Sequence, residues 1–200
     1  MNRLSLASYF LAFVMSIAMI SSCRKHDFPG KPSSMYSADV LDKWIGMQLR
    51  LMKNATGIQN QAFSRHYAYS GVAALEALAP GLPSHSKWTK KWNGLTGLPT
   101  PQYLKRYYYP ANVNAAMAAI NKAMFPNASS ADKMAIDSLE AAFNTQFLKS
   151  QPASVISRSN QFGKAVADAV YAWCETDDYK NANNDYTVPT GPGMWVPTPP

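Results

Sequence analysis

Apolar residues recur every three or four positions in five stretches of this chain, which is the period of an amphipathic α-helix. We find no run of alternating apolar and polar residues long enough to predict a strand. The pattern therefore predicts an all-α fold, a helical bundle of about five amphipathic helices. The stretches cover about 37–54, about 59–79, Pro110 to Pro126, Ser129 to Phe147, and Pro152 to about 176–178.

Local signals mark the ends of several of these helices. Pro110 suits the first turn of a helix, where its missing N–H costs no hydrogen bond. Ser129 and Asp132 have the spacing of a capping box, in which the side chain of the first residue accepts a hydrogen bond from a free backbone amide. Gly57 and the pair Pro80-Gly81 predict helix ends.

The middle of the chain carries two packing signals. Gly71 and its alanine neighbours make one face of the second helix thin, so we expect another helix to approach it closely. The stretch 80–109 has no helical period and contains several prolines and glycines. Irregular stretches of this length are usually functional or disordered. Because this one is also rich in Trp, Tyr and Leu, we predict one long ordered loop packed on the helices.

The N-terminus has the pattern of a secretory signal peptide, with Arg3 followed by a short apolar core over 9–20. The core is shorter than the roughly 20 residues that a membrane span needs. Ile20-Ser21-Ser22-Cys23 resembles a bacterial lipobox, so we predict lipidation of Cys23. An ordinary N-terminal membrane anchor with an incidental Cys is the alternative. The interpretation we favour is an exported protein anchored by lipid in the bacterial envelope, most simply at the outer membrane.

The same reading divides the chain into four parts. The last of them is Pro-rich, extended and aromatic, and it ends on Thr198-Pro199-Pro200 as though the chain were interrupted. The predicted parts are a signal peptide over 1–22, a tether over 23–36, a helical region over 37–178, and an extended crossover segment over 179–200.

Charge and cysteine content point to no nucleic-acid partner and to no disulfide. The formal charge is +7, and loss of Arg3 with the signal peptide would leave +6. The basic residues are scattered rather than gathered on one helix face, so we expect no nucleic-acid partner. With Cys23 lipidated, Cys174 has no partner for a disulfide, and we expect it to be a small core residue.

No catalytic or metal-binding set can be assembled from spacing. His66 lies within the second helix, and we favour a structural role for it over a ligand or a base. Ser84 and His85 are adjacent, but a nucleophile and its base need to be paired in space and oriented by a third group.

Loop aromatics are the remaining candidates for binding: Trp88, Trp92, Tyr107, Tyr108 and Tyr109 alternate with Lys and Arg. Such rings stack on bases or sugars. The alternative, which we favour, is that they anchor the loop to the helices while the cations stay solvated.

Several strings, taken in order, resemble vanadium-dependent haloperoxidase-like proteins of the type-2 phosphatidic acid phosphatase superfamily. The resemblance extends over nearly the whole mature chain, and its most specific part is Gly191-Pro192-Gly193-Met194-Trp195 and the residues after it. That string is similar to the crossover between the two helical halves of these proteins. The strings are 36–44, 63–77, 93–95, 109–116, 124–127 and 191–200.

The resemblance implies a helical scaffold whose complete form binds vanadate, or a phosphate substrate, through a His, a Lys, two Arg and hydroxyl or backbone donors. This sequence departs from that pattern. No Arg precedes a Pro, and Pro83-Ser84-His85 lacks the Gly of the family's Pro-Ser-Gly-His string. We therefore assign no catalytic residue, and we expect this chain alone to be inactive and to hold no cofactor.

Two functions remain open from the sequence. The first is the N-terminal helical half of an exported haloperoxidase- or phosphatase-like protein. In that case a missing C-terminal half, or a homo-oligomer partner, would cover its apolar helix faces. The second is a non-enzymatic surface lipoprotein that binds glycans through Trp88, Trp92 and the cluster Tyr107 to Tyr109.

Overall fold

The computed structural model describes residues 31–58, 62–82, 91–181 and 187–196. Within these ranges the chain is helical and contains no strand, so the predicted all-α bundle is confirmed. None of the described helices combines the length and apolar character needed to cross a membrane. The five long helices are α2 (Asp39–Asn54), α3 (Phe63–Leu78), α4 (Tyr109–Met124), α5 (Ser130–Leu148) and α6 (Ala153–Cys174).

Four short 3₁₀ helices extend or precede these elements. They are η1 (Ser33–Met35), η3 (Ala79–Gly81), η6 (Glu175–Asp177) and η7 (Tyr179–Asn181). The predicted helix ends hold where they can be checked. Pro110 occupies the first turn of α4. The Ser129 side chain caps α5 by accepting a hydrogen bond from the amide of Asp132.

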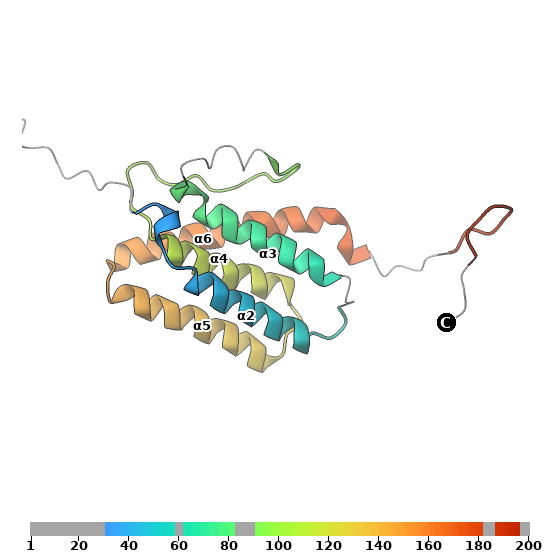
Figure 1. The fold of residues 1–200 in the computed structure, drawn as a ribbon, viewed down its shortest axis with the longest axis horizontal. Helices are drawn as coiled ribbons and strands as arrows, with labels where there is room; N and C mark the ends of the chain where they lie inside the picture. Colours follow the sequence, from blue (N-terminus) through green and yellow to red (C-terminus); the bar gives the residue numbers. More distant parts are fainter. Residues whose placement is uncertain (1–30, 59–61, 83–90, 182–186, 197–200) are drawn as a thin grey trace, which may run out of the picture.

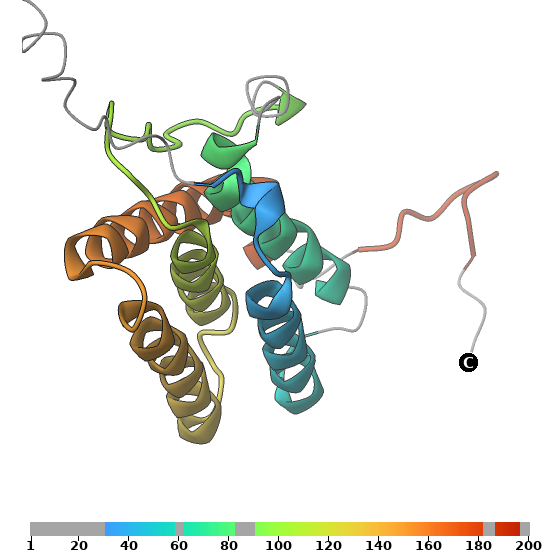
Figure 2. The same ribbon diagram turned by 60° about the vertical axis from the view of Figure 1, so that its left-hand side comes forward.

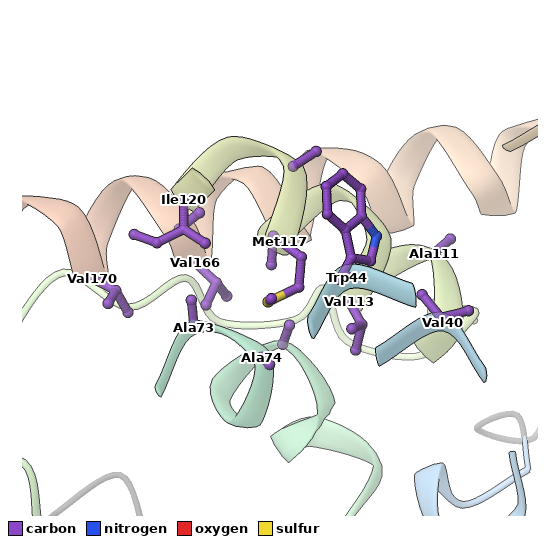
Figure 3. Close-up of a cluster of buried hydrophobic side chains, with 14 of the residues drawn as sticks. Val40, Trp44, Ala73, Ala74, Ala111, Val113, Met117, Ile120, Val166 and Val170 are labelled. Atoms are coloured by element: carbon purple, nitrogen blue, oxygen red, sulfur yellow. The ribbon is translucent and has the colours of Figure 1, made fainter. Parts of the chain in front are cut away.

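The bundle is built around α4, which buries 13 of its 16 residues. Figure 2 shows α4 between α3, α2, α5 and α6. An alanine-rich helix suits this position because its short side chains let several helices approach. Side chains from four helices form the core drawn in Figure 3: Val40 and Trp44 of α2, Ala73 and Ala74 of α3, Ala111, Val113, Met117 and Ile120 of α4, and Val166 and Val170 of α6.

Two helices approach each other closely at Gly163 in α6. A Cβ added there would overlap the backbone carbonyl oxygen of Asn112 and lie 3.1 Å from the amide nitrogen of Ala116. Gly71 behaves otherwise, because it is exposed and a Cβ on it would meet nothing within 4 Å. The expected close packing therefore holds at the alanine neighbours Ala73, Ala74 and Ala77, which are buried, but it is wrong for Gly71. The glycine that admits a neighbouring helix is Gly163.

The segment before α2 also corrects the prediction. Ser33 and Tyr36, expected to belong to the tether, instead pack on the bundle. Ser33 is buried, and the Tyr36 ring meets those of Tyr108 and Tyr109 edge-on at 5.3 and 6.3 Å between centroids. The aromatic ring supplies enough apolar surface to order the end of an otherwise polar segment.

The described parts of the long loop and the tail differ in their packing. In 91–108 the chain runs over the helices, with Trp92, Leu95 and Leu98 against the core, as the ordered-loop prediction expects. In 187–196 the chain extends away from the bundle (Figures 1 and 2). Met194, Trp195 and Val196 are exposed there by 52, 71 and 77%.

Candidate functional site

A pocket of about 270 Å³ lies at one end of the bundle, where α2, α4 and α6 all terminate. Its apolar wall includes Leu51, Met124 and Phe125, and its polar lining includes Arg65, His66, Asp132 and Glu175. The C-terminal carbonyls of several helices leave a negative field in such a place. The polar lining therefore decides which chemistry the pocket supports.

His66 is almost fully buried, with 1% of its surface exposed. Its Nδ1 lies 2.9 Å from the carbonyl oxygen of Ala62, and its Nε2 lies 3.1 Å from that of Met124. Both ring nitrogens thus face backbone carbonyls, and the ring joins the start of α3 to the end of α4. The geometry agrees with the structural role favoured from the sequence, because neither nitrogen is directed at a ligand in the pocket.

Asp132 is the buried carboxylate of the lining. It accepts hydrogen bonds from Arg50 Nε at 2.8 Å, from Asn54 Nδ2 at 3.1 Å and from the Ser129 hydroxyl at 2.9 Å. These bonds, that of Ser129 foremost, lower the pKa of the Asp132 carboxyl below its ordinary value. The group therefore ties the end of α2 to the start of α5 and is saturated as an acceptor.

Arg65 makes the second ionic contact of the lining. Its Nε and Nη2 donate to the two carboxylate oxygens of Asp177 at 2.6 and 3.1 Å, and Nη2 also donates to the carbonyl of Cys174 at 3.1 Å. The Tyr69 hydroxyl donates to Asp177 at 3.1 Å. A two-pronged Arg–carboxylate pair is directional, so it fixes the end of α6 against α3.

Burial governs the titration of the neighbouring groups. Burial, and after it the hydrogen bond to Asp177, raises the pKa of the Tyr69 hydroxyl to about 12. For the Asp177 carboxyl, burial alone would raise the pKa, but the hydrogen bonds from Arg65 and the Tyr179 amide outweigh it and the pKa is lowered. Burial also raises the pKa of the Cys174 thiol to about 12, which makes it a core residue, as expected, rather than a nucleophile.

The three predicted tyrosines pack inward. Tyr107 and Tyr109 are buried, with 7 and 5% of their surface exposed. Tyr107 stacks edge-on with Phe162, and Tyr108 stacks edge-on with Phe147. These rings join the end of the loop to the helices, which favours the anchoring interpretation over sugar stacking at Tyr107 and Tyr109.

Trp92 is half-buried, and its Nε1 donates to the Glu76 carboxylate at 2.7 Å. Its ring lies 6.4 Å from that of Trp173, which donates from Nε1 to the carbonyl of Asn93 at 3.0 Å. The structure therefore places Trp92 away from the tyrosine cluster. The other candidates, Cys23, Ser84, His85 and Trp88, lie outside the described residues.

Two further arginines lie beside the N-terminal end of α6. Arg106 donates to the Gln151 amide oxygen at 2.6 Å. Arg158 donates to the backbone carbonyl of Arg106 at 2.7 Å. They lie at the opposite end of α6 from the pair of Arg65 with Asp177. In the described part of the chain, no three His, Cys, Asp or Glu side chains are grouped so that they would hold a metal ion.

The ion pairs and hydrogen bonds of this region join the ends of α2, α3, α4, α5 and α6. Of the charged residues that line the pocket, Asp132 pairs with Arg50 and Arg65 pairs with Asp177, while Glu175 and Lys180 complete the charged lining. Burial keeps the nearby Cys174 thiol protonated by raising its pKa to about 12. Sequence reasoning missed the pocket and its ion pairs. Arg65 and Asp177 are 112 positions apart, and no local sequence pattern predicts a contact between residues so far apart.

Comparison with known proteins adds one finding. The chain is similar to a bacterial vanadium-dependent iodoperoxidase of known crystal structure, with a TM-score of 0.58 and 27% sequence identity. The match covers 81% of this chain and 37% of that chain. No protein-family model matches this chain, and no curated protein matches its sequence. The likeness supports a vanadium haloperoxidase-like helical fold.

Proposed function

We propose that this chain is the helical scaffold portion of an exported vanadium haloperoxidase- or phosphatase-like protein, and that the residues which hold the oxyanion lie outside it. The observation that carries the proposal is the likeness to the iodoperoxidase at 27% identity over 81% of the chain. The match takes up only 37% of that peroxidase, so the similarity concerns a part of such an enzyme.

The placement of the cations supports the second half of the proposal. A vanadate or phosphate site needs several cationic donors that converge on one point and are not already neutralised. Here Arg50 and Arg65 are bound to carboxylates, and Arg106 and Arg158 lie at the other end of α6. Lys180 adds one lysine to the pocket lining, which is fewer cations than such a site needs. Among the described residues this arrangement does not fit vanadate, and we derive no reaction step through it.

The role left to these residues is to position others. The ion pairs of Asp132 and Asp177 fix the ends of α2, α5 and α6 around one pocket, and His66 fixes the adjoining end of α4. A scaffold of this kind holds catalytic groups supplied by another segment within the narrow tolerances that catalysis requires.

The coding DNA that follows Pro200 tests the proposal directly. We expect it to encode an Arg-Pro string, a Ser-Gly-His string and a later Arg followed by His, in frame or after a frameshift. Downstream DNA that encodes none of these strings would count against the scaffold role.

Export and lipid anchoring form the other part of the proposal, supported by the lipobox-like Ile20-Ser21-Ser22-Cys23. Cells that express the chain and are fed an alkyne-bearing palmitate analogue should label it. Cys23→Ser should abolish the label, and Cys174→Ser, which changes a buried thiol, should retain it. Equal labelling of the parent and Cys23→Ser would contradict the anchor.

A further inference from the structure

A turn in the long loop presents two apolar side chains to solvent. The amide of Lys105 donates to the carbonyl of Gln102 at 3.2 Å, which closes a four-residue turn with Tyr103 and Leu104 at its corners. Tyr103 is 87% exposed and Leu104 is 56% exposed. Within the described residues, no other large apolar or aromatic side chain is as exposed as that of Tyr103.

Leu104 adopts a backbone conformation that does not suit its residue type. Its φ is 56°, in the left-handed region, where a type II turn places its third residue and glycine is the usual choice. A bulky residue there is strained. Leu104 gains little packing in return, because more than half of its surface is exposed. A partner outside its own chain would explain an exposed leucine at a position that glycine fills better.

The turn is fixed to the bundle by the residues beside it. The amide of Gln102 donates to the hydroxyl oxygen of Tyr107 at 3.1 Å, and Tyr107 is buried. Arg106 donates to the amide oxygen of Gln151 at 2.6 Å, and Arg158 donates to the carbonyl of Arg106 at 2.7 Å. These bonds hold the turn next to the connection between α5 and α6.

Further apolar side chains are exposed at the same end of the bundle. Leu148, the last residue of α5, lies three positions before Gln151 and is 50% exposed. Met35 of η1 is 66% exposed, and its neighbour Tyr36 packs on Tyr108. Figure 1 shows η1, the described loop and the α5–α6 connection at one end of the bundle, and the C-terminal tail leaving from the other. We call the four exposed side chains the tip cluster: Met35, Tyr103, Leu104 and Leu148.

The segments that carry most of the tip cluster contain cations and no carboxylates. The chain has no Asp or Glu in 77–131 and none in 141–167. The fold brings these two segments together and places Lys105 and Lys149, both exposed, beside the cluster. The start of α2, at the same end, holds two acidic residues that two lysines offset: Asp39 and Asp42 with Lys31 and Lys43.

We propose that the tip cluster and its lysines form a membrane-docking surface that rests on a bilayer with anionic headgroups. Exposed aliphatic and aromatic side chains enter the boundary between headgroups and acyl chains, while lysines around them meet the negative surface of the bilayer. The strained Leu104 then gains its apolar contacts from lipid rather than from its own chain.

The position of the N-terminus supports lipid as the partner. The described chain begins at Lys31, at the same end of the bundle as the tip cluster (Figure 1) and eight positions after Cys23. Eight residues span at most about 28 Å, whereas the 22 residues of α6 extend over about 33 Å. An anchor at Cys23 would therefore hold the tip cluster, rather than the pocket at the other end, toward the membrane. This step rests on the proposed lipid anchor, whereas the apolar and charged surface does not.

Fluorescence quenching by lipid tests the docking on the full chain, reconstituted into vesicles through its own N-terminus. A bimane probe is attached at Leu148→Cys, in the tip cluster, or at Met134→Cys, an exposed position near the start of α5 at the opposite end. The chain without an added cysteine gives the labelling background, because Cys174 is buried. Lipids brominated on their acyl chains quench a probe that enters the bilayer.

We expect strong quenching at position 148 and little at position 134 in vesicles of phosphatidylcholine with phosphatidylglycerol. Quenching at position 148 should fall in vesicles of phosphatidylcholine alone. It should also fall at high salt, which screens the attraction between the lysines and the anionic headgroups.

Leu104→Gly separates docking from folding. Glycine adopts a positive φ without strain, so the helical circular dichroism spectrum should be unchanged while the apolar side chain is lost. With the probe at position 148, the ratio of docked to undocked chains should fall on the order of threefold, from the insertion preference of one leucine. Met134→Gln, which removes an exposed apolar side chain at the opposite end, is the matched control and should leave the ratio unchanged.

A pair of lysine substitutions tests the electrostatic part. Lys105→Gln combined with Lys149→Gln should lower the docked ratio about 25-fold, because each lysine near an anionic surface contributes about fivefold. Lys53→Gln combined with Lys133→Gln removes two exposed lysines at the opposite end. This control pair should leave the ratio unchanged.

Equal quenching at positions 134 and 148, or quenching at neither, would overturn the proposal. So would quenching at position 148 that Leu104→Gly and the Lys105 and Lys149 pair leave unchanged. The palmitate label on Cys23 tests the anchor separately. A chain that labels but is not quenched at position 148 refutes the docking surface alone, and a chain that is quenched there without labelling refutes the lipid anchor alone.

Discussion

The substitution Gly163→Ala probes the contact on which the bundle depends most, that between α4 and α6. In a helix interior the change from Gly to Ala is favourable by about 1 kcal/mol. Here the new Cβ would overlap the Asn112 carbonyl oxygen and lie 2.9 Å from its carbon and 3.1 Å from the Ala116 nitrogen. Ordinary contacts between heavy atoms of this kind lie at about 3.5–4.0 Å, so the two helices must move apart.

The atoms that the new methyl meets belong to the backbone and have no rotamer into which to escape. We therefore take the upper end of the usual overpacking cost, about 3 kcal/mol. Subtracting the helix-propensity gain of about 1 kcal/mol leaves a net loss of about 2 kcal/mol in the free energy of unfolding. Urea denaturation followed by circular dichroism at 222 nm measures this difference.

Gly71→Ala is the matched control, because a Cβ at Gly71 meets nothing within 4 Å. It should raise the free energy of unfolding by up to about 1 kcal/mol. Opposite signs for the two substitutions are the expected result. Equal stabilisation by both would refute the inference that α4 and α6 are in backbone contact at Gly163.

Three further predictions concern single side chains. Trp44→Phe removes the indole N–H that donates to the buried Asn114 Oδ1 at 2.9 Å. It should lower the free energy of unfolding, measured by urea denaturation, by about 1–3 kcal/mol. A loss below about 0.5 kcal/mol, on the order of experimental error, would contradict this prediction. Hydrogen bonds, that of Ser129 foremost, lower the pKa of the Asp132 carboxyl below its ordinary value of 3.8. The stability that this carboxylate contributes is therefore complete above pH 3.8 and is lost as the pH falls through the lower pKa of the folded state. Asp132→Asn should therefore flatten the acid side of the stability–pH curve, and an unchanged slope would argue against this role. Burial raises the pKa of the Cys174 thiol to about 12. At pH 8, roughly the ordinary pKa of a free thiol, a thiol reagent should therefore label Cys174 far more slowly in the folded chain than in urea. Equal labelling rates would show that the thiol is accessible in the folded chain.

The helices could be predicted from the sequence because each is specified locally. The 3.6-residue period gives the buried face, and residues such as Pro110 and Ser129 act within one turn of the helix end that they mark. The structural role of His66 could also be favoured from the sequence, because the residue lies within a predicted helix.

The contacts between helices could not be predicted in the same way. Trp44 and Asn114 are 70 positions apart, and which buried donor meets which acceptor depends on the crossing angles of the helices. The two glycines make the same point. Gly71 looked in the sequence like the site of close helix approach, whereas the structure gives that role to Gly163. One glycine cannot be told from the other before the helices are placed.

The most direct test of the account is an assay of the purified chain with vanadate, hydrogen peroxide and iodide. Triiodide formation is followed by absorbance, and vanadate binding is followed by vanadium NMR of the same sample. We predict no binding and no iodide oxidation above that of free vanadate, because the Arg50 and Arg65 guanidinium groups are held by carboxylates. A chain that binds vanadate and oxidises iodide well above this background would contradict the claim that the oxyanion-holding residues lie elsewhere.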